Sequence, residues 1–236
     1  RRRGPTGGFN GASGVSFLTY RIEPTGARAF RRAHVPPRCR PSWQDAGVVD
    51  ASGQPQAGDL LVASVALTDG IFDQTVVLLL DHDESGTLGV VVNRFSHLDL
   101  DDVLPQWADE VALPGRLHYG GPMSPNGAIC LASLADPGTE PPGWRRLFHD
   151  VGLLHLDTPV DIIQGAFRSL RIFAGYAGWE PNQLAGEVTH GAWHLAPAQY
   201  DDIFGQDPES LWRAVLRRQG GPVAYFATWT AEPDQN

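Results

Sequence analysis

The chain has 236 residues, of which 42% are hydrophobic and 19% charged, so it is long enough for one large globular domain or two small ones. No run approaches the roughly 18 consecutive apolar residues of a membrane helix, and the basic N-terminus lacks the apolar core of a secretory signal. The two cysteines, Cys39 and Cys130, lie in unlike contexts, which favours free thiols in a reducing cytosol over a disulfide framework.

Charge is divided unevenly along the chain. Residues 1–50 hold nine arginines and three acids, a net charge of +6, while the remainder holds nine arginines and 24 acids, a net charge of −15. Non-specific affinity for nucleic acid comes mainly from basic side chains that neutralise phosphates. Direct nucleic-acid binding by the folded part is therefore not expected.

The first 57 residues are expected to be a disordered basic extension, and residues 58–236 the folded domain. The extension is rich in Arg, Gly, Pro and Ser, and its prolines interrupt any regular element. Such a composition cannot bury enough apolar surface to offset the entropy of ordering. A basic arm that contacts nucleic acid is the alternative interpretation of this segment.

The folded part is predicted to begin with strands. Residues 60–65 and 75–80 are apolar runs typical of buried strands, residues 81–87 form a long polar hairpin loop, and residues 88–93 return as a strand. Further strands are predicted at residues 128–132, 152–156, 171–176 and 192–195, and residues 118–122 are predicted to be the end of a strand that runs into a tight turn.

Helices are predicted between and after these strands. Apolar residues from Leu100 to Val111 have helical spacing with a break at Pro105, and helices are expected over residues 160–170 and 181–190. A last helix opens at Asp207 as N-cap, with Pro208 at its first position, and ends before Gly220. Because helices follow the strands irregularly, the sequence predicts a single α+β domain.

Several familiar sites are excluded. The Asp81-x-Asp83-x-Ser85-Gly86 start of a calcium loop lacks the acid required at the twelfth position, and Gly191 separates His190 from His194. Cys130 lies in an apolar strand, as a core cysteine does. No GxSxG, P-loop, GxGxxG or CxxC motif occurs. We therefore assign no catalytic residue, metal ligand or cofactor.

The stretch from Arg171 to Leu184 is the main candidate for a functional surface. We expect five side chains in and just after this stretch to converge: Arg171, Tyr176, Trp179, Gln183 and Glu187. Arg171 and Glu187 would then form an ion pair. Gly175 and Gly178 would let two segments cross closely. The pattern fits a pocket or partner surface with aromatic walls, and it also fits a packed corner between a strand and a helix.

A second group of candidates precedes this stretch. His118 comes shortly before Gly120 and Gly121, and glycines expose backbone N–H groups to a ligand or serve a turn with positive φ. Asn93, at the end of a predicted strand, is placed on the same surface.

The sequence resembles the YqgE/AlgH family of bacterial proteins. The resemblance covers about residues 58–230 and is carried by an ordered series of motifs: Gly58–Ala63, Thr75–Leu79 followed by His82-Asp83, Leu88–Arg94, Gly120-Gly121-Pro122, Arg171–Leu184 and Gly191-Ala192-Trp193. Phe95, Glu180, Asn182 and the Ser64-Val65-Ala66 segment depart from the family pattern. The resemblance implies a compact α+β domain with a curved, partly barrel-like mixed sheet flanked by helices.

The resemblance also implies a cytoplasmic protein but no particular reaction, although some family members are labelled transcriptional regulators. We therefore expect a non-enzymatic binding or regulatory protein that acts through a protein partner or a small molecule, without direct DNA contact and without a membrane. The alternative is an enzyme with a pocket near His118, Arg171 and Glu187. Direct DNA binding would need Arg213, Arg217 and Arg218 to lie beside Arg145-Arg146.

Overall fold

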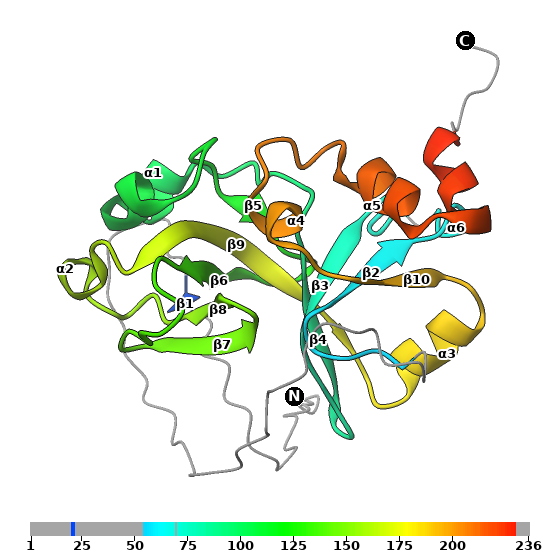
Figure 1. The fold of residues 1–236 in the computed structure, drawn as a ribbon, viewed down its shortest axis with the longest axis horizontal. Helices are drawn as coiled ribbons and strands as arrows, with labels where there is room; N and C mark the ends of the chain where they lie inside the picture. The colour runs from blue at the N-terminus through cyan, green and yellow to red at the C-terminus, as the bar shows by residue number, and fades with distance from the viewer. Residues whose placement is uncertain (1–19, 22–53, 69, 230–236) are drawn as a thin grey trace, which may run out of the picture.

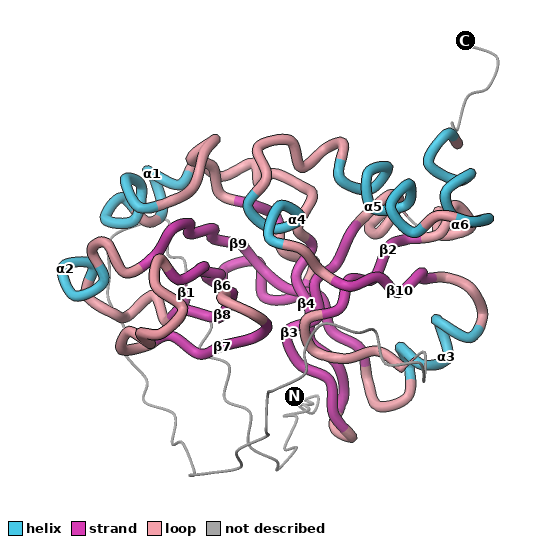
Figure 2. The backbone as a smooth tube through the Cα atoms, in the orientation of Figure 1, coloured by secondary structure: helices cyan, strands magenta, loops and turns pink. Residues whose placement is uncertain are grey.

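Ten strands among the described residues form one curled, mixed sheet with short helices around it (Figures 1 and 2). The structure is a computed structural model that describes residues 20–21, 54–68 and 70–229. The strands are β1 (Tyr20–Arg21), β2 (Asp59–Ala63), β3 (Val76–Asp83), β4 (Gly86–Val91), β5 (His118–Tyr119), β6 (Met123–Leu134), β7 (Trp144–Phe148), β8 (Val151–Leu154), β9 (Phe167–Trp179) and β10 (Trp193–Pro197). The helices are α1 (Leu100–Val103), η1 (Pro105–Glu110), α2 (Val160–Ile163), α3 (Gln183–Thr189), α4 (Tyr200–Phe204), α5 (Leu211–Gln219), α6 (Gly221–Tyr225) and η2 (Phe226–Thr228).

The main path through the sheet is β10-β2-β3-β4-β9-β6-β8-β7. Its neighbours along this path are antiparallel, and β5 adds a parallel pairing to β9, so the sheet is mixed. In Figure 1 the sheet curls between the group around β6–β9 and the group around β2–β4. The predicted α+β domain with a curved mixed sheet is confirmed.

The first two predicted apolar runs form neighbouring strands, β2 and β3, and the third forms β4 beside them. The prediction of a long polar loop over residues 81–87 is wrong. Strand β3 continues through Asp83 and β4 begins at Gly86, so only Glu84 and Ser85 form the turn. Backbone pairing resumes at Asp81 after a bulge that follows Leu79, and a strand that projects past the core tolerates exposed polar side chains.

Strand β9 is the longest of the described strands and links the two groups of the sheet. It pairs with β4 near its C-terminal end and with β6 along most of its length. The predicted helix over residues 160–170 is wrong beyond Ile163, because Gly165 has a φ of 73° and Phe167–Leu170 pair with β6. This long-range pairing outweighs the local helical spacing of the apolar residues.

The C-terminal helices differ in detail from the prediction. Helix α5 begins at Leu211 and not at Pro208, because Pro208–Ser210 form a separate turn in which the Asp207 carboxylate accepts the Ser210 N–H. Gly220 ends the helix with a φ of 69°, as predicted. Helix α4 was not predicted; a capping box between Gln199 and Asp202 closes its N-terminus.

In the described part of the chain, buried apolar side chains fall into three clusters on the faces of the sheet. Cys130 is a buried free thiol in the second cluster, and burial raises its pKa well above the usual value. The interpretation of Cys130 as a core residue is confirmed. Cys39 lies outside the described residues.

The candidate basic face does not form. Arg213 donates to the carbonyls of Ala227 and Trp229, Arg218 pairs with Asp202, and Arg146 pairs with Glu140. Helix α5 and strand β7, which carry these arginines, lie at opposite ends of the molecule in Figure 1.

Two residues of the predicted extension, Tyr20 and Arg21, pair with β6 as β1. Residues 1–19 and 22–53 lie outside the described residues, so the boundary at residue 57 stays a prediction. Among the described residues, no helix has the length and apolar character needed to cross a membrane.

Candidate functional site

Glycines let β9 pass directly against the segment that follows β5. A Cβ atom on Gly120, Gly121 or Gly175 would stand less than 3.0 Å from backbone atoms of the other segment, which real Cβ atoms do not show. A Cβ on Gly178 would meet the sulfur of Met123 at 2.9 Å. The predicted close crossing is confirmed at Gly175, whose backbone partner is the Gly120-Gly121 pair, whereas Gly178 faces the Met123 side chain.

Glu187 gathers three side-chain donors at the junction of β9, α3 and β10. Its Oε2 accepts the indole Nε1–H of Trp179 at 2.9 Å and that of Trp193 at 2.8 Å, and its Oε1 accepts from Gln183 at 2.9 Å. Phe72 packs on both indoles, with centroid distances of 6.2 and 5.6 Å. We call these five residues the Glu187 cluster; three of them were predicted to converge.

Arg171 lies elsewhere, so the predicted Arg171–Glu187 ion pair is wrong. Its buried guanidinium donates to the carbonyls of Ile203 at 2.5 Å, Gly205 at 3.0 Å and Leu113 at 3.1 Å. Helix α4 and the loop after η1 supply these oxygens beside β9. Burial lowers the pKa of Arg171 to about 10, so the group stays protonated at neutral pH and acts as an internal clamp.

His118 is buried beneath Phe95. Its ring lies 4.9 Å from the ring of Phe95 and 5.5 Å from that of Phe173, and neither ring nitrogen has a hydrogen-bond partner among the described residues. Burial, helped by the positive charges of Arg171 and Arg116, lowers the pKa of His118 to about 3. The imidazole is therefore neutral at physiological pH.

Asn93 and Tyr176 occupy structural positions. The Asn93 side chain accepts from the Val76 N–H at 2.8 Å and donates to the Gln74 carbonyl at 2.9 Å. Tyr176 packs on a different core cluster from Trp179. The predicted surface is thus divided: Trp179, Gln183 and Glu187 lie together, whereas the candidates of the β5–β9 contact lie in a second place. These are His118, Gly120, Gly121, Arg171 and Tyr176.

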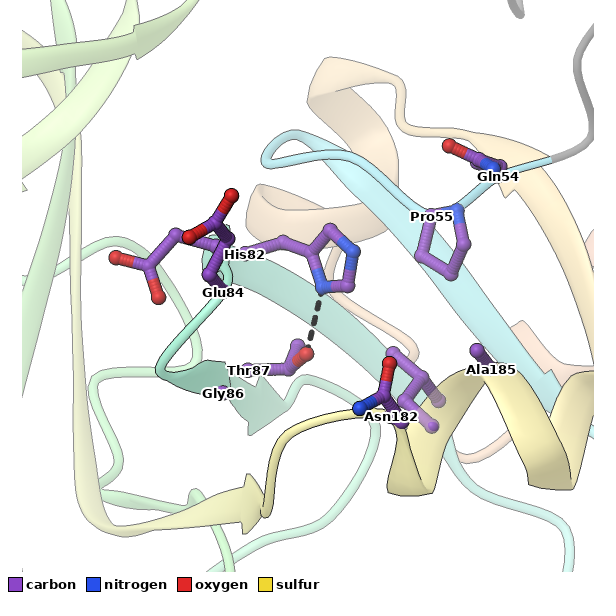
Figure 3. Close-up of a pocket in the computed structure, with 10 residues that line it drawn as sticks. Gln54, Pro55, His82, Glu84, Gly86, Thr87, Asn182 and Ala185 are labelled. Carbon is purple, nitrogen blue, oxygen red and sulfur yellow. Dashed lines mark hydrogen bonds between the residues drawn. The ribbon is translucent and has the colours of Figure 1, made fainter.

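A pocket lies next to the Glu187 cluster, between the β3–β4 hairpin, α3 and the segment before β2 (Figure 3). Its volume is about 290 Å³. We call it the hairpin pocket, and the residues that line it are Gln54, Pro55, His82, Asp83, Glu84, Gly86, Thr87, Asn182, Leu184 and Ala185.

The polar groups of the hairpin pocket favour a positively charged or hydrogen-donating ligand. The His82 Nδ1 atom lies 2.6 Å from the Thr87 hydroxyl, and in Figure 3 the imidazole lies between Thr87 and Pro55. Hydrogen bonds from Ser85 lower the pKa of Asp83, which keeps that carboxylate ionised. Among the described residues, no arginine lines the pocket, and the chain contains no lysine.

The pocket and the Glu187 cluster share their supporting elements. Thr87 is paired with Trp179 across β4 and β9, and Leu184 is buried in the same core cluster as both indoles. Sequence reasoning missed His82, Thr87 and Asn182. The signals present were the polar run that ends β3 and the residue before α3, where Asn182 adopts a φ of 64° that asparagine tolerates.

The positions excluded as metal ligands have other contacts. His190 ends α3, with its Nδ1 atom 2.7 Å from the Gly186 carbonyl, and the ring of His194 stacks on Phe226. In the described part of the chain, no group of three or more His, Cys, Asp or Glu side chains gathers where it could hold a metal ion.

A second hollow of about 350 Å³ lies on the segment that follows β4. We call it the Phe95 groove, and the residues that line it are Arg94, Phe95, Ser96, His97, Leu98, Tyr119, Pro125 and Ala174. None of the three residues of the enzymatic alternative, His118, Arg171 and Glu187, lines either of these hollows.

The curled sheet, its few short helices and the pocket at the end of a hairpin define a single compact α+β domain of the half-barrel kind. The chain belongs to the AlgH-like family, whose profile matches residues 60–224. The resemblance to the YqgE/AlgH family is therefore confirmed.

Relatives and solved structures agree with this assignment. A UPF0301 protein of Streptomyces avermitilis is 47% identical over 182 residues, which cover 76% of this chain and 94% of the relative, and one of Thermobifida fusca is 42% identical over 188 residues, with the same coverage. A crystal structure of a Corynebacterium diphtheriae protein matches with a TM-score of 0.70 at 30% identity, covering 75% of this chain and 93% of that one. The solution structure of the AlgH protein from Pseudomonas aeruginosa matches with a TM-score of 0.55 at 27% identity, covering 74% and 94%.

Proposed function

We propose that this protein is a non-enzymatic binding protein of the bacterial cytoplasm, which regulates through a ligand or protein partner and not through contact with DNA. Its binding site is the hairpin pocket, and its ligand carries a basic group on a short aliphatic stem. The observation that carries this proposal is the lining of the pocket, in which the described residues combine carboxylates and other polar groups with an apolar wall and include no arginine.

The charges of the pocket support a basic ligand. Asp83 stays ionised, and Glu84 lies beside it in the exposed turn. Residues 51–236 carry a net charge of −15, which raises the local concentration of cations near such a site. A basic group that reached Asp83 would form a charge-assisted hydrogen bond of the stronger kind.

The apolar wall supports an aliphatic stem. Pro55, Leu184 and Ala185 line the pocket together with the polar groups. Amphipathic side chains commonly lay their methylene groups along apolar surface while the charged end stays with polar partners. A free amine or guanidine, or an Arg or Lys side chain presented by a partner protein, has this chemistry.

The enzymatic alternative has less support. His118 lies close enough to Arg171 to be affected by its charge, but His118 is buried under Phe95 and Arg171 is fixed by carbonyls. Glu187 lies elsewhere and is fixed by indoles. The contact between His82 and Thr87 brings a base to a hydroxyl, but an activated nucleophile also needs a third group that orients the base. Among the described residues, no side-chain partner is found for the other nitrogen of His82.

Thermal unfolding of the full chain tests the proposal with n-butylguanidine as probe and n-butyrate as its anionic counterpart. Ligand that binds the native state raises the melting temperature by mass action. We expect n-butylguanidine to raise it and n-butyrate to leave it unchanged. Equal effects of the two probes, or no effect of n-butylguanidine at millimolar concentration, would overturn the basic-ligand assignment.

Variants localise the binding. The double variant Asp83→Asn with Glu84→Gln removes both charges and is expected to abolish the shift, whereas Asp161→Asn, an exposed acid on α2, is the matched control that keeps it. A peptide with one internal arginine, tested beside free n-butylguanidine, distinguishes a partner's side chain from a free small molecule.

A further inference from the structure

We infer that the Phe95 groove binds a short segment of a partner protein in which an apolar side chain is flanked by carboxylates. This site is separate from the hairpin pocket: Gly86 and Thr87 at the start of β4 line the pocket, whereas the groove lies on residues 94–98 after the end of β4. The two hollows also differ in charge, since in the described part of the chain an arginine lines the groove and none lines the pocket.

Phe95, an apolar residue of the groove lining, is held in place. Phe95 rests on the buried ring of His118, and an isolated bridge pairs the backbones of these two residues. The Tyr119 N–H donates to the Arg94 carbonyl at 2.9 Å, and the Ser96 N–H donates to the Leu117 carbonyl at 3.0 Å. The groove is therefore a formed surface, and binding does not require its backbone to be ordered first.

Two arginines give the groove a local positive charge. The Arg116 guanidinium lies 4.3 Å from the centre of the Phe95 ring, and Arg94 lines the groove while donating to the carbonyls of Ile71 and Asp73. Among residues 54–68 and 70–229, no carboxylate lies within ion-pair distance of either guanidinium. Carboxylates of a partner would complement this pair, in contrast to the acidic charge of the folded part as a whole.

The extent of the apolar surface favours a protein segment over a small acid. Leu98 in the groove is 47% exposed, and Pro125 on β6, which also lines the groove, is exposed as well. A cavity of about 350 Å³ takes one large side chain, and these exposed apolar residues of its lining continue the contact. A peptide would cover the cavity and these residues, with its carboxylates towards the arginines.

A phage-displayed library of random twelve-residue peptides, selected on the full chain, provides the test. We expect enriched peptides to carry Asp or Glu beside Leu, Ile or Phe. Synthetic versions of these peptides are then measured by fluorescence anisotropy. Charge reversal by Arg116→Glu is expected to weaken binding about tenfold or more, and Leu98→Ser to weaken it several-fold. Both residues are exposed, so neither change should prevent folding.

Arg217→Glu is the matched control, because Arg217 is an exposed arginine near the end of α5, away from the groove. It should leave peptide affinity unchanged. The inference is overturned if no peptide is enriched, if enriched peptides lack acids, or if Arg116→Glu and Arg217→Glu bind alike. Titration of hexanoate into ¹⁵N-labelled protein tests the alternative that the groove binds a small free acid. Chemical-shift changes of the Leu98 and Tyr119 amides, without enrichment of any peptide, would assign the groove to a free acid and overturn the inference of a peptide site. Failure of n-butylguanidine at the hairpin pocket leaves this test unaffected.

Discussion

The Glu187 carboxylate accepts the indole N–H of Trp179 at 2.9 Å, which ties the end of β9 to α3. The same carboxylate oxygen accepts the indole N–H of Trp193 from β10 at 2.8 Å. Both indoles are buried, so water cannot replace this acceptor without opening the packing. Because α3 forms one wall of the hairpin pocket, the half-buried Glu187 holds that wall against the sheet.

Replacement of Glu187 by alanine should destabilise the protein by about 2–4 kcal/mol, since two buried N–H donors lose their acceptor. Glu187→Gln should cost about 1 kcal/mol or less, because its amide oxygen still accepts from the indoles. Urea unfolding followed by tryptophan fluorescence measures both. Glu180→Ala, an exposed acid in the turn before α3, is the control and should change little. Equal losses for Glu187→Ala and Glu180→Ala would remove the structural role assigned to the cluster.

Alanine at Gly175 should prevent β9 from passing Gly121. The new methyl group would overlap backbone atoms of Gly121 and Met123, and the φ of 73° would be strained as well. We expect a loss of about 3 kcal/mol or more in unfolding free energy. Gly186→Ala is the matched control, because that glycine lies in α3 with nothing within 4 Å of its Cβ position and should gain about 0.5–1 kcal/mol. If chemical denaturation showed that both variants change the unfolding free energy in the same direction, the close crossing at Gly175 would be contradicted.

Continuous apolar runs made the central strands predictable. The residues from Val76 to Leu80 are all apolar, which favours a strand that is buried on both faces, and they form such a strand in β3. The glycines of the crossing were also recognisable, because close approach of two backbones is one of the few reasons for glycines in a strand. Their partner was not recognisable, since Gly175 and Gly121 are 54 positions apart and nothing local connects them.

There are physical reasons why the rest of the candidate site could not be predicted from the sequence. The partners of Arg171 are backbone carbonyls, which every residue carries, so its clamp leaves no pattern in the sequence. The Glu187 carboxylate, by contrast, accepts hydrogen bonds from Trp179 and Gln183, which precede it by eight and four residues in the sequence. This part of the candidate surface was therefore predicted. His82 was overlooked because its run resembled a loop, whereas long-range pairing extended the strand through it.

Burial of neutral His118 should make stability depend on pH. Its folded pKa of about 3 lies below the ordinary value of 6.5, so the unfolded chain binds a proton that the folded protein does not. Stability is then complete above about pH 6.5 and falls by about 1.4 kcal/mol per unit as the pH decreases towards 3. His194, whose pKa is also lowered by burial, adds to this slope, whereas the raised pKa values of Asp59 and Asp81 oppose it at the acidic end.

His118→Phe separates this contribution from the others. It keeps a ring between Phe95 and Phe173 but cannot titrate. We expect the difference in unfolding free energy between pH 6.5 and pH 5 to shrink by about 1–2 kcal/mol, whatever the variant does to stability at a single pH. His97→Gln, an exposed histidine, serves as the control. An unchanged slope for His118→Phe would show that the imidazole is not held neutral in the fold.

Arg171→Met tests the clamp that replaced the predicted ion pair. Methionine keeps the unbranched stem but leaves the carbonyls of Ile203, Gly205 and Leu113 without the guanidinium, so unfolding free energy should fall by about 3–5 kcal/mol. Hydrogen exchange of the α4 amides should accelerate first, because two of these carbonyls belong to α4 and its end.

Arg171→Lys keeps the charge and should restore part of the loss, which provides a folded variant if Arg171→Met does not fold. Lysine offers a single donor point in place of a planar fork, so it cannot reach three separated carbonyls in the same geometry. Arg217→Met is the matched control for removal of an exposed arginine and should cost less than about 0.5 kcal/mol. If Arg171→Lys lost as little as Arg217→Met and kept full protection of α4, charge alone would hold this corner, and the fork geometry would have no part in it.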